Sequence, residues 1–151
     1  MDFFRNENFW LYLPLIAWIS GIFYLSSSKG SVARTAIYYL PLLNFLFPRD
    51  DGGAAKTFKT HHFIVRKTSH FVAYAILALL ASIVFYNSML VYPARFWYVF
   101  AFAIVLIVAA ADEIRQSFYP ERVGSVSDVA LDCLGGLTMI LLFWIFAANG
   151  F

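Results

Sequence analysis

The sequence predicts an all-α integral membrane protein, a four-helix bundle with an extra short interfacial or re-entrant helix in its first loop. Two observations lead to this prediction: the composition of the chain and the spacing of its apolar segments. Of the 151 residues, 62% are hydrophobic and 13% are charged, against roughly 25% charged in an ordinary soluble domain. The mean hydropathy is +0.72. We therefore expect a single membrane domain over residues 1–151.

Four apolar segments approach the length of about 20 residues that a helix needs to cross a bilayer. Helix is expected in each, because backbone polar groups in lipid must be paired within their own segment. The third segment has only sixteen residues, so Asp112 and Glu113 lie inside the apolar border if its helix continues past Ala111. The predicted spans cover residues 9–27, 70–92, 96–111 and 129–148.

The stretches between the spans differ in character. Ala36–Phe47 is apolar but too short to cross a membrane, and it contains Pro41, so it predicts the interfacial or re-entrant helix. Arg49–His62 is polar and glycine-bearing and predicts a loop. Val91–Arg95 predicts a tight helical connection. The N-terminal stretch has no basic signal-peptide region, which indicates a retained first helix. The role of the long first loop, residues 32–66, stays open.

Composition also excludes some classes of function. The net charge of +2 is small, and no basic stripe interleaved with aromatic residues appears, which argues against nucleic acid. The single cysteine, Cys133, excludes an intrachain disulfide and is interpreted as a small packing residue. Small residues indicate where helices meet closely; they are Ala78, Ala81 and Ser82 in the second span and Gly135 and Gly136 in the fourth.

The predicted spans bring most polar residues to one end of the bundle. The second span begins, the third ends and the fourth begins on the same side of the membrane, together with the end of the first span near Ser26. The alternating direction of successive spans forces this convergence. The candidate site residues are Lys67, His70, Tyr74, Asp112, Glu113, Gln116, Arg122, Asp128 and Asp132.

Helical spacing refines this set. Asp112 and Gln116 are four residues apart and share a helix face, as do Asp128 and Asp132. Lys67, His70 and Tyr74 follow one another at spacings of three and four at the start of the second span. A serine, Ser125 or Ser127, is expected to cap the fourth helix, and Asp128 suits the positive end of its dipole.

Charges at helix ends near a membrane border are usually solvated, and we interpret Arg66, Arg115 and Glu121 in this way. Asp132 and Glu113 are different, because an acid within a span is costly and usually faces a partner or a cavity.

Three stretches together resemble the VanZ-like family of small bacterial membrane proteins. Phe23–Ser31 (FYLSSSKGS) resembles the end of the family's first helix. Arg66–Leu80 (RKTSHFVAYAILALL) resembles its K-x-x-H-F-x-x-Y motif, and Asp112–Gly136 (DEIRQSFYPERVGSVSDVALDCLGG) resembles its D-E-x-x-Q-x-F motif with the R-x-G-x-x-x-D segment that follows. The motif residues that match are Lys67, His70, Phe71, Tyr74, Asp112, Glu113, Gln116, Phe118, Arg122, Gly124, Asp128 and Gly135.

The chain departs from the family pattern at Asp132, where the pattern has Asn. Two interpretations stay open: the added acid raises the affinity for a cation or shifts the pKa of a neighbour, or the position is only a polar contact. The resemblance implies a link to low-level resistance to the glycopeptide antibiotic teicoplanin, and it implies no particular reaction.

The first hypothesis for function is binding of an anionic lipid or a cell-envelope component, such as a lipid-linked cell-wall intermediate. Lys67 and Arg122 would hold a phosphate or carboxylate, since the arginine fork donates two parallel hydrogen bonds. Gln116 and His70 would add neutral donors. The oligomeric state stays open.

The second hypothesis is a membrane-embedded hydrolase or transferase acting on a lipid-linked or phosphate-bearing substrate, with His70 and Glu113 or Asp112 as base and orienting group. Neither a nucleophile motif nor H-E-x-x-H nor a phosphate-binding glycine loop supports it. We assign no cofactor and no metal ligands, although oxygen-rich ligands of this kind suit a divalent cation, Mg²⁺ or Ca²⁺. The third hypothesis is a structural ion-pair network in a non-catalytic accessory protein.

Lysine and arginine are divided unevenly between the two sides of the predicted bundle. The side with the first and third loops has nine of the eleven, and the N-terminal stretch and the second loop have one each. By the positive-inside rule, the polar end faces the cytoplasm and both termini lie outside. We expect a multi-pass protein of the bacterial cytoplasmic (inner) membrane. Resistance to an antibiotic that acts on the cell wall would favour an outward site, so the side to which the site opens is left undecided.

Overall fold

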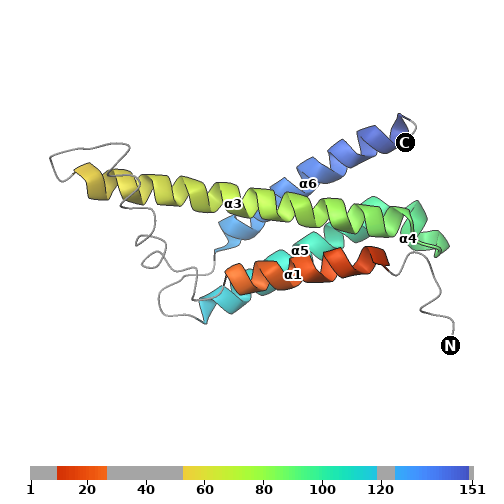
Figure 1. Ribbon diagram of the computed structural model, residues 1–151, viewed down its shortest axis with the longest axis horizontal. Helices are drawn as coiled ribbons and strands as arrows, with labels where there is room; N and C mark the ends of the chain where they lie inside the picture. The colour runs from red at the N-terminus through yellow and green to blue at the C-terminus, as the bar shows by residue number, and fades with distance from the viewer. Residues whose placement is uncertain (1–9, 27–52, 119–124, 150–151) are drawn as a thin grey trace.

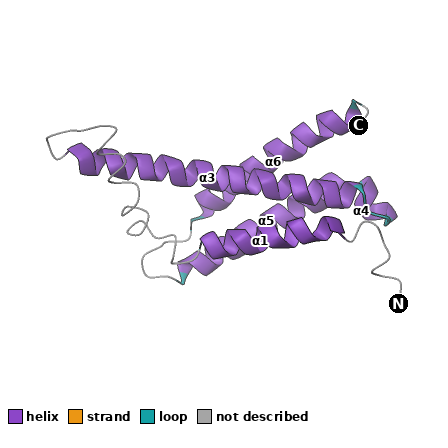
Figure 2. Ribbon diagram, in the orientation of Figure 1, coloured by secondary structure: helices purple, strands orange, loops and turns teal. Residues whose placement is uncertain are grey.

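A computed structural model describes residues 10–26, 53–118 and 125–149. These residues form helices joined by short turns, with no strand among them (Figure 2), which confirms the all-α prediction. The helices are α1 (Tyr12–Leu25), α3 (Gly53–Tyr86), α4 (Val91–Arg95), α5 (Trp97–Ser117) and α6 (Val126–Ala148).

The long helix α3 is the centre of the bundle. It contacts α1, α5 and α6, and α5 and α6 also contact each other (Figure 1). The beginning of α1, the short α4 and the end of α6 lie toward one end of the molecule, whereas the end of α5 and the beginning of α6 lie toward the other. The fold therefore brings the two ends of the predicted polar stretch, Asp112 and Asp128, to the same region beside α3.

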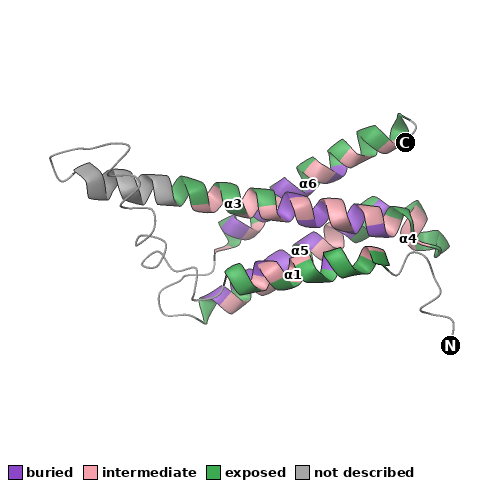
Figure 3. Ribbon diagram, viewed as in Figure 1, coloured by how far each residue is buried: buried purple, intermediate pink, exposed green. Residues whose placement is uncertain are grey.

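Within the described residues, three helices are long and apolar enough to cross a membrane: Phe63–Tyr86 within α3, then α5 and α6. The first helix, α1, is shorter, with 14 residues, which rise about 21 Å. Many large apolar residues are exposed along the helices, and Figure 3 shows the exposed positions in green. A surface of this kind suits contact with lipid chains, so the bundle is a membrane bundle.

The helix boundaries differ from the sequence prediction at three places. The second span is predicted to reach residue 92, whereas α3 ends at Tyr86 and a turn separates it from α4. Because α3 begins at Gly53, the prediction of a loop over Arg49–His62 is wrong for residues 53–62. Extending a formed helix costs little compared with starting one, and alanine and lysine in this stretch are good helix formers. The helix α5 continues past Ala111 to Ser117, so its acids lie within a helix. The short helix predicted over Ala36–Phe47 lies outside the described residues.

Small residues allow the central helices to pack closely. Ala78, Ala81 and Ser82 are fully buried on α3, as expected. On α6, a Cβ added to Gly135 would lie 2.4 Å from the backbone oxygen of Phe71, far inside van der Waals contact. A Cβ at Gly136 would lie 2.7 Å from Val105 Cγ1 on α5. These two glycines therefore hold α6 against both neighbours, one turn beyond Asp132.

Aromatic side chains gather at the end of the bundle where α3 meets α5. Tyr86, Trp97 and Phe143 contact one another edge to face, with ring centroids 5.1 to 6.1 Å apart. Tyr98 stacks on Trp144. Tyrosine and tryptophan are enriched at the membrane–water border, so this end fits one interface and the polar end fits the other.

Candidate functional site at the polar end of the bundle

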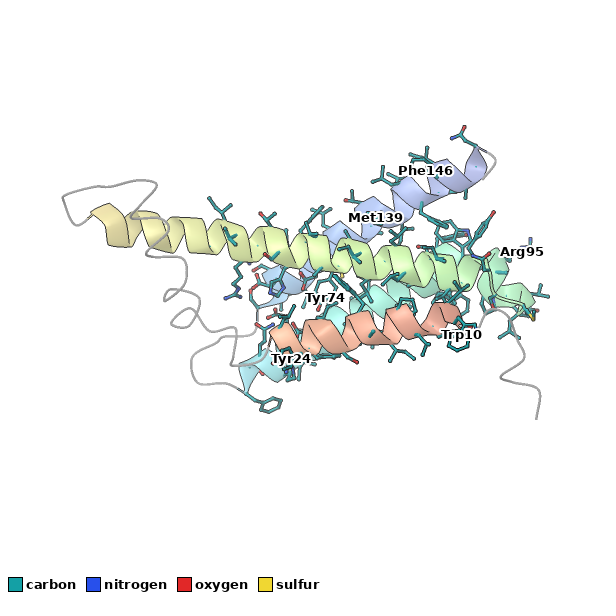
Figure 4. All side chains as sticks on the ribbon, in the orientation of Figure 1. Trp10, Tyr24, Tyr74, Arg95, Met139 and Phe146 are labelled. Carbon is teal, nitrogen blue, oxygen red and sulfur yellow. The ribbon has the colours of Figure 1, made fainter. Side chains whose placement is uncertain are left out.

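Side chains from four helices form a polar cluster at one end of the bundle. The end of α1, the middle of α3, the end of α5 and the beginning of α6 contribute to it, in the region between Tyr24 and Tyr74 in Figure 4. Among the described residues, the buried polar side chains of this cluster are Ser26, Asp112, Glu113, Gln116, Asp128 and Asp132.

Asp112 is the centre of a closed hydrogen-bond network. Its Oδ1 accepts from the Ser26 hydroxyl and from Arg115 Nη2, the latter at 3.1 Å, and its Oδ2 accepts from Gln116 Nε2 at 2.8 Å. Arg115 also donates to the Ser26 hydroxyl oxygen. Asp112 is fully buried, but both of its oxygens are paired and its charge is balanced by a guanidinium. The network ties the end of α1 to α5.

Asp128 is paired with two cations of α3. Arg66 Nη2 donates to its Oδ2 at 2.8 Å, and Lys67 Nζ donates to its Oδ1. The carboxylate is buried, whereas the side chains of Arg66 and Lys67 are 32% and 26% exposed. Two cations on one carboxylate leave a net positive charge that reaches the surface at the membrane border.

His70 and Asp132 face each other one turn further into the bundle. The Nδ1 atom of His70 lies 3.3 Å from Asp132 Oδ1 and 3.5 Å from Oδ2. Both distances are longer than an ordinary N–H···O hydrogen bond of about 2.7–3.2 Å, and Oδ1 makes no hydrogen bond. Asp132 is 0% exposed and has neither a lysine nor an arginine among its ion pairs in the described part of the chain. It is an acid in the bundle interior with one weak partner.

Two further polar groups beside Asp132 are incompletely paired. Glu113 accepts from the Ser125 amide through Oε2 at 2.8 Å, but its Oε1 is buried without a hydrogen-bond partner. The Tyr74 hydroxyl is also buried, and it has no hydrogen-bond partner within the described part of the chain. Its ring stacks on His70, with centroids 6.4 Å apart. A buried polar atom left unpaired costs about 1–3 kcal/mol, so this part of the cluster is incompletely paired.

His70, Glu113 and Asp132 each offer one ligand atom, and these three atoms lie within 4.8 Å of one another. They come from α3, α5 and α6, so the set exists only where the three central helices meet.

The structure places eight of the nine candidate residues at this end: Lys67, His70, Tyr74, Asp112, Glu113, Gln116, Asp128 and Asp132. Arg122 lies outside the described residues. What these residues do is a prediction that their positions alone leave untested.

The roles expected for two other residues are wrong. Arg66 and Arg115 are not solvated anchors, since each is paired with a buried carboxylate. The spacing of three between Asp112 and Arg115 is the signal that would have identified the second pair. Ser125 is the N-cap residue of α6, as expected, but its hydroxyl pairs with that of Ser127 and makes no capping bond. Glu121, also interpreted as an anchor, lies outside the described residues.

A bundle of apolar helices with buried acids at one end defines a class of protein, the multi-pass α-helical membrane proteins. The family model for VanZ/LLP1 matches residues 9–147, so the chain belongs to the VanZ/LLP1 family. The resemblance seen in the sequence motifs is thereby confirmed. No curated protein and no solved structure matches the chain.

Proposed function

We propose that this VanZ/LLP1 protein binds the phosphate-bearing headgroup of an anionic lipid or of a lipid-linked cell-envelope component at the polar end of its bundle. The observation that supports the proposal is the pairing of Arg66 and Lys67 with the single carboxylate of Asp128. The pair of cations retains one net positive charge, and both side chains are partly exposed. Cations at the membrane border attract anionic headgroups.

The positive charge is also held at a fixed place in the structure. Asp128 holds the two cations side by side at the start of α6, and Lys67 lies over the ring of Phe63 at 5.5 Å. Binding costs less conformational entropy when the cationic side chains are already held in place. The family resemblance also includes Arg122 in the motif, and the proposal gives it the role of a third cation.

A thermal melting experiment on the purified full-length protein in neutral detergent tests the proposal. Phosphatidylglycerol, a polyprenyl phosphate and zwitterionic phosphatidylcholine are added separately. We expect phosphatidylglycerol and the polyprenyl phosphate, which carry a net negative charge, to raise the melting temperature. Phosphatidylcholine, which has no net charge, should have no effect. The comparison of the two anionic ligands distinguishes a bulk lipid from a lipid-linked carrier.

The matched variants are Arg66→Gln and Arg95→Gln. Arg66 lies on the polar end, whereas Arg95 lies in α4 at the opposite end. The anionic shift is expected to shrink in Arg66→Gln and to persist in Arg95→Gln, and added salt should reduce it in the wild type. Equal shifts in both variants would show that the lipid acts on the detergent micelle and would contradict the proposal.

A membrane-embedded hydrolase or transferase acting on a phosphate-bearing substrate is the second candidate. The specific observation in its favour is the incompletely paired set of His70, Glu113 and Asp132, one turn inward from Lys67 and Asp128. A headgroup held by Arg66 and Lys67 would lie about 6 Å along the helix axis from this set. Release of phosphate or headgroup from a lipid by the wild type, and its loss in His70→Ala, would establish this activity.

The link to teicoplanin is part of the same proposal. A protein that holds lipid-linked envelope components would alter the target of a glycopeptide, and we place it in the bacterial cytoplasmic membrane with its polar end inside. Expression in a teicoplanin-susceptible Gram-positive host is expected to raise the inhibitory concentration, and Arg66→Gln is expected to remove the effect. An unchanged inhibitory concentration with the wild type would separate this chain from glycopeptide resistance.

A further inference from the structure

We infer that His70, Glu113 and Asp132 bind one divalent transition-metal ion of the Mn²⁺ or Zn²⁺ type. This site goes beyond the binding of a lipid headgroup and does not depend on it. Each of the three residues comes from a different helix, and their ligand atoms lie within 4.8 Å of one another.

The ligand atoms lie somewhat further apart than in a filled site. In a tetrahedral site, two ligands at about 2.0–2.2 Å from the ion are about 3.3–3.6 Å apart. The widest pair, at up to 4.8 Å, must therefore close by about 1 Å, which side-chain rotation provides. Three protein ligands with open positions are typical of metal sites that also bind water or substrate.

The pairing of the four acids explains why the ion would bind here. Asp112 is balanced by Arg115, and Asp128 by Arg66 and Lys67. Glu113 and Asp132 are 5% and 0% exposed, and within the described residues neither forms an ion pair with a lysine or an arginine.

Two carboxylates buried together repel each other and are poorly solvated. A divalent cation would neutralise both, with His70 as the neutral third ligand. A cation would therefore balance the two carboxylates that lack a lysine or arginine partner in the described part of the chain, whereas Asp112 and Asp128 are already paired with basic side chains.

A second observation points to a ligand at the same place. Glu113 Oε1, Asp132 Oδ1 and the Tyr74 hydroxyl are buried, and none of them has a hydrogen-bond partner among the described residues. Tyr74 is 1% exposed, and its ring stacks on that of His70. An ion would use the two free carboxylate oxygens, and a water on the ion would give the phenol a partner. A single metal ion with its bound water would thus give a partner to all three atoms.

The types of ligand indicate which metal ion the site prefers. Imidazole suits Zn²⁺ and similar ions, whereas carboxylates suit Mn²⁺, Mg²⁺ and Ca²⁺. Ca²⁺ takes six to eight oxygen ligands, and Mg²⁺ keeps an octahedral shell rich in water. One nitrogen with two carboxylates therefore favours Mn²⁺ or Zn²⁺ over the Mg²⁺ or Ca²⁺ expected from carboxylates alone.

The departure from the family pattern lies in this site. Where the resemblance places Asn, this chain has Asp132, which adds a full negative charge between His70 and Glu113. The Asp132→Asn variant is therefore the most useful one, because the family pattern indicates that the fold accommodates an asparagine at this position.

The experiment measures Mn²⁺ binding to the full-length protein, purified in detergent and freed of metal with a chelator. Electron paramagnetic resonance of free Mn²⁺ reports the stoichiometry and affinity, and Zn²⁺ is added as a competitor. We expect one Mn²⁺ per chain, displaced by Zn²⁺. Asp132→Asn and Glu113→Gln should each weaken binding by at least about tenfold, since even outer partners of a metal site contribute that much.

The matched controls are Asp128→Asn, one turn from Asp132 on α6, and Asp112→Asn, adjacent to Glu113 on α5. Both should melt below the wild type, because each breaks an ion pair of a buried carboxylate, but at a temperature where they are folded both should bind Mn²⁺ with wild-type affinity. Melting temperatures with and without Mn²⁺ provide a second readout, because an ion that binds only the folded state raises the midpoint.

Absence of Mn²⁺ and Zn²⁺ binding in the wild type would overturn the site, and so would an equal loss in all four acid variants. If one variant fails to fold, the melting shift of the other site variant against its control decides the question. The lipid experiment uses Arg66→Gln, which leaves the three ligands intact. Failure of headgroup binding is thereby distinguishable from failure of the metal site.

Discussion

Asp112 and Glu113 are consecutive residues of α5, yet their carboxylates have opposite surroundings. Both oxygens of Asp112 accept hydrogen bonds, and Arg115 balances its charge. Glu113 has one oxygen on the Ser125 amide and the other buried without a partner. Neighbouring positions on a helix face different directions, so α5 presents Asp112 toward α1 and Glu113 toward α6.

The same division occurs on α6 between Asp128 and Asp132, one turn apart. Asp128 is bonded to Arg66 and Lys67, whereas Asp132 has only the distant imidazole of His70. One acid of each helix is therefore paired with basic side chains, and the other belongs to an incompletely paired set. We infer that the paired acids brace the bundle and that the other two belong to a site.

Close packing of α6 against α3 is predicted to depend on Gly135. Its Cβ in Gly135→Ala would meet the backbone oxygen of Phe71 at 2.4 Å, and overpacking of this kind costs about 1–3 kcal/mol. We expect a lower melting temperature in detergent. Gly21→Ala is the control, because a Cβ there meets nothing within 4 Å. If both variants melt together, the helices separate easily and the close approach has no energetic weight.

The Tyr74 hydroxyl is predicted to contribute nothing to the stability of the metal-free protein. It is buried without a hydrogen-bond partner, so Tyr74→Phe removes an unsatisfied group and should leave the free energy of unfolding unchanged or raise it by about 1 kcal/mol. Unfolding by detergent titration measures this difference. A loss of stability in Tyr74→Phe would mean that the hydroxyl has a hydrogen-bond partner in the metal-free protein. It would weaken the argument for a metal ion beside it.

The polar end is predicted to face the cytoplasm, as the distribution of lysine and arginine indicates. Single cysteines are introduced into a Cys133→Ser background, at Ser117 on the polar end and at Met89 near α4, both of which are exposed. A membrane-impermeant thiol reagent applied to intact cells should label Met89→Cys and spare Ser117→Cys. The reverse pattern would place the site outside and would favour direct contact with the cell wall.

Much of the fold was predictable, because apolar length and the pairing of backbone groups in lipid leave few alternatives. The convergence of His70, Asp112 and Asp132 follows from the alternating direction of the spans. The start of α3 at Gly53 was not predictable from polarity, since a polar helical extension and a polar loop have the same composition.

The sequence also could not predict which acids are paired with basic side chains and which are not. Asp128 and Asp132 are both aspartates and share a helix face. Which of them pairs with Arg66 depends on how far α6 is rotated about its axis relative to α3. Side-chain packing sets that rotation, at positions such as Gly135 and Phe71. The departure at Asp132 from the family pattern was visible, but its position beside two unpaired oxygens required the structure.

The most direct test of the central claim is the melting temperature of four variants in metal-free detergent: Asp112→Asn, Glu113→Gln, Asp128→Asn and Asp132→Asn. Removing one partner of a buried ion pair costs about 3–5 kcal/mol, so Asp112→Asn and Asp128→Asn should melt well below the wild type. Glu113→Gln and Asp132→Asn relieve repulsion between two buried carboxylates and should melt at or above it. If all four melt equally low, the whole cluster is a structural brace, and the division into brace and site is wrong.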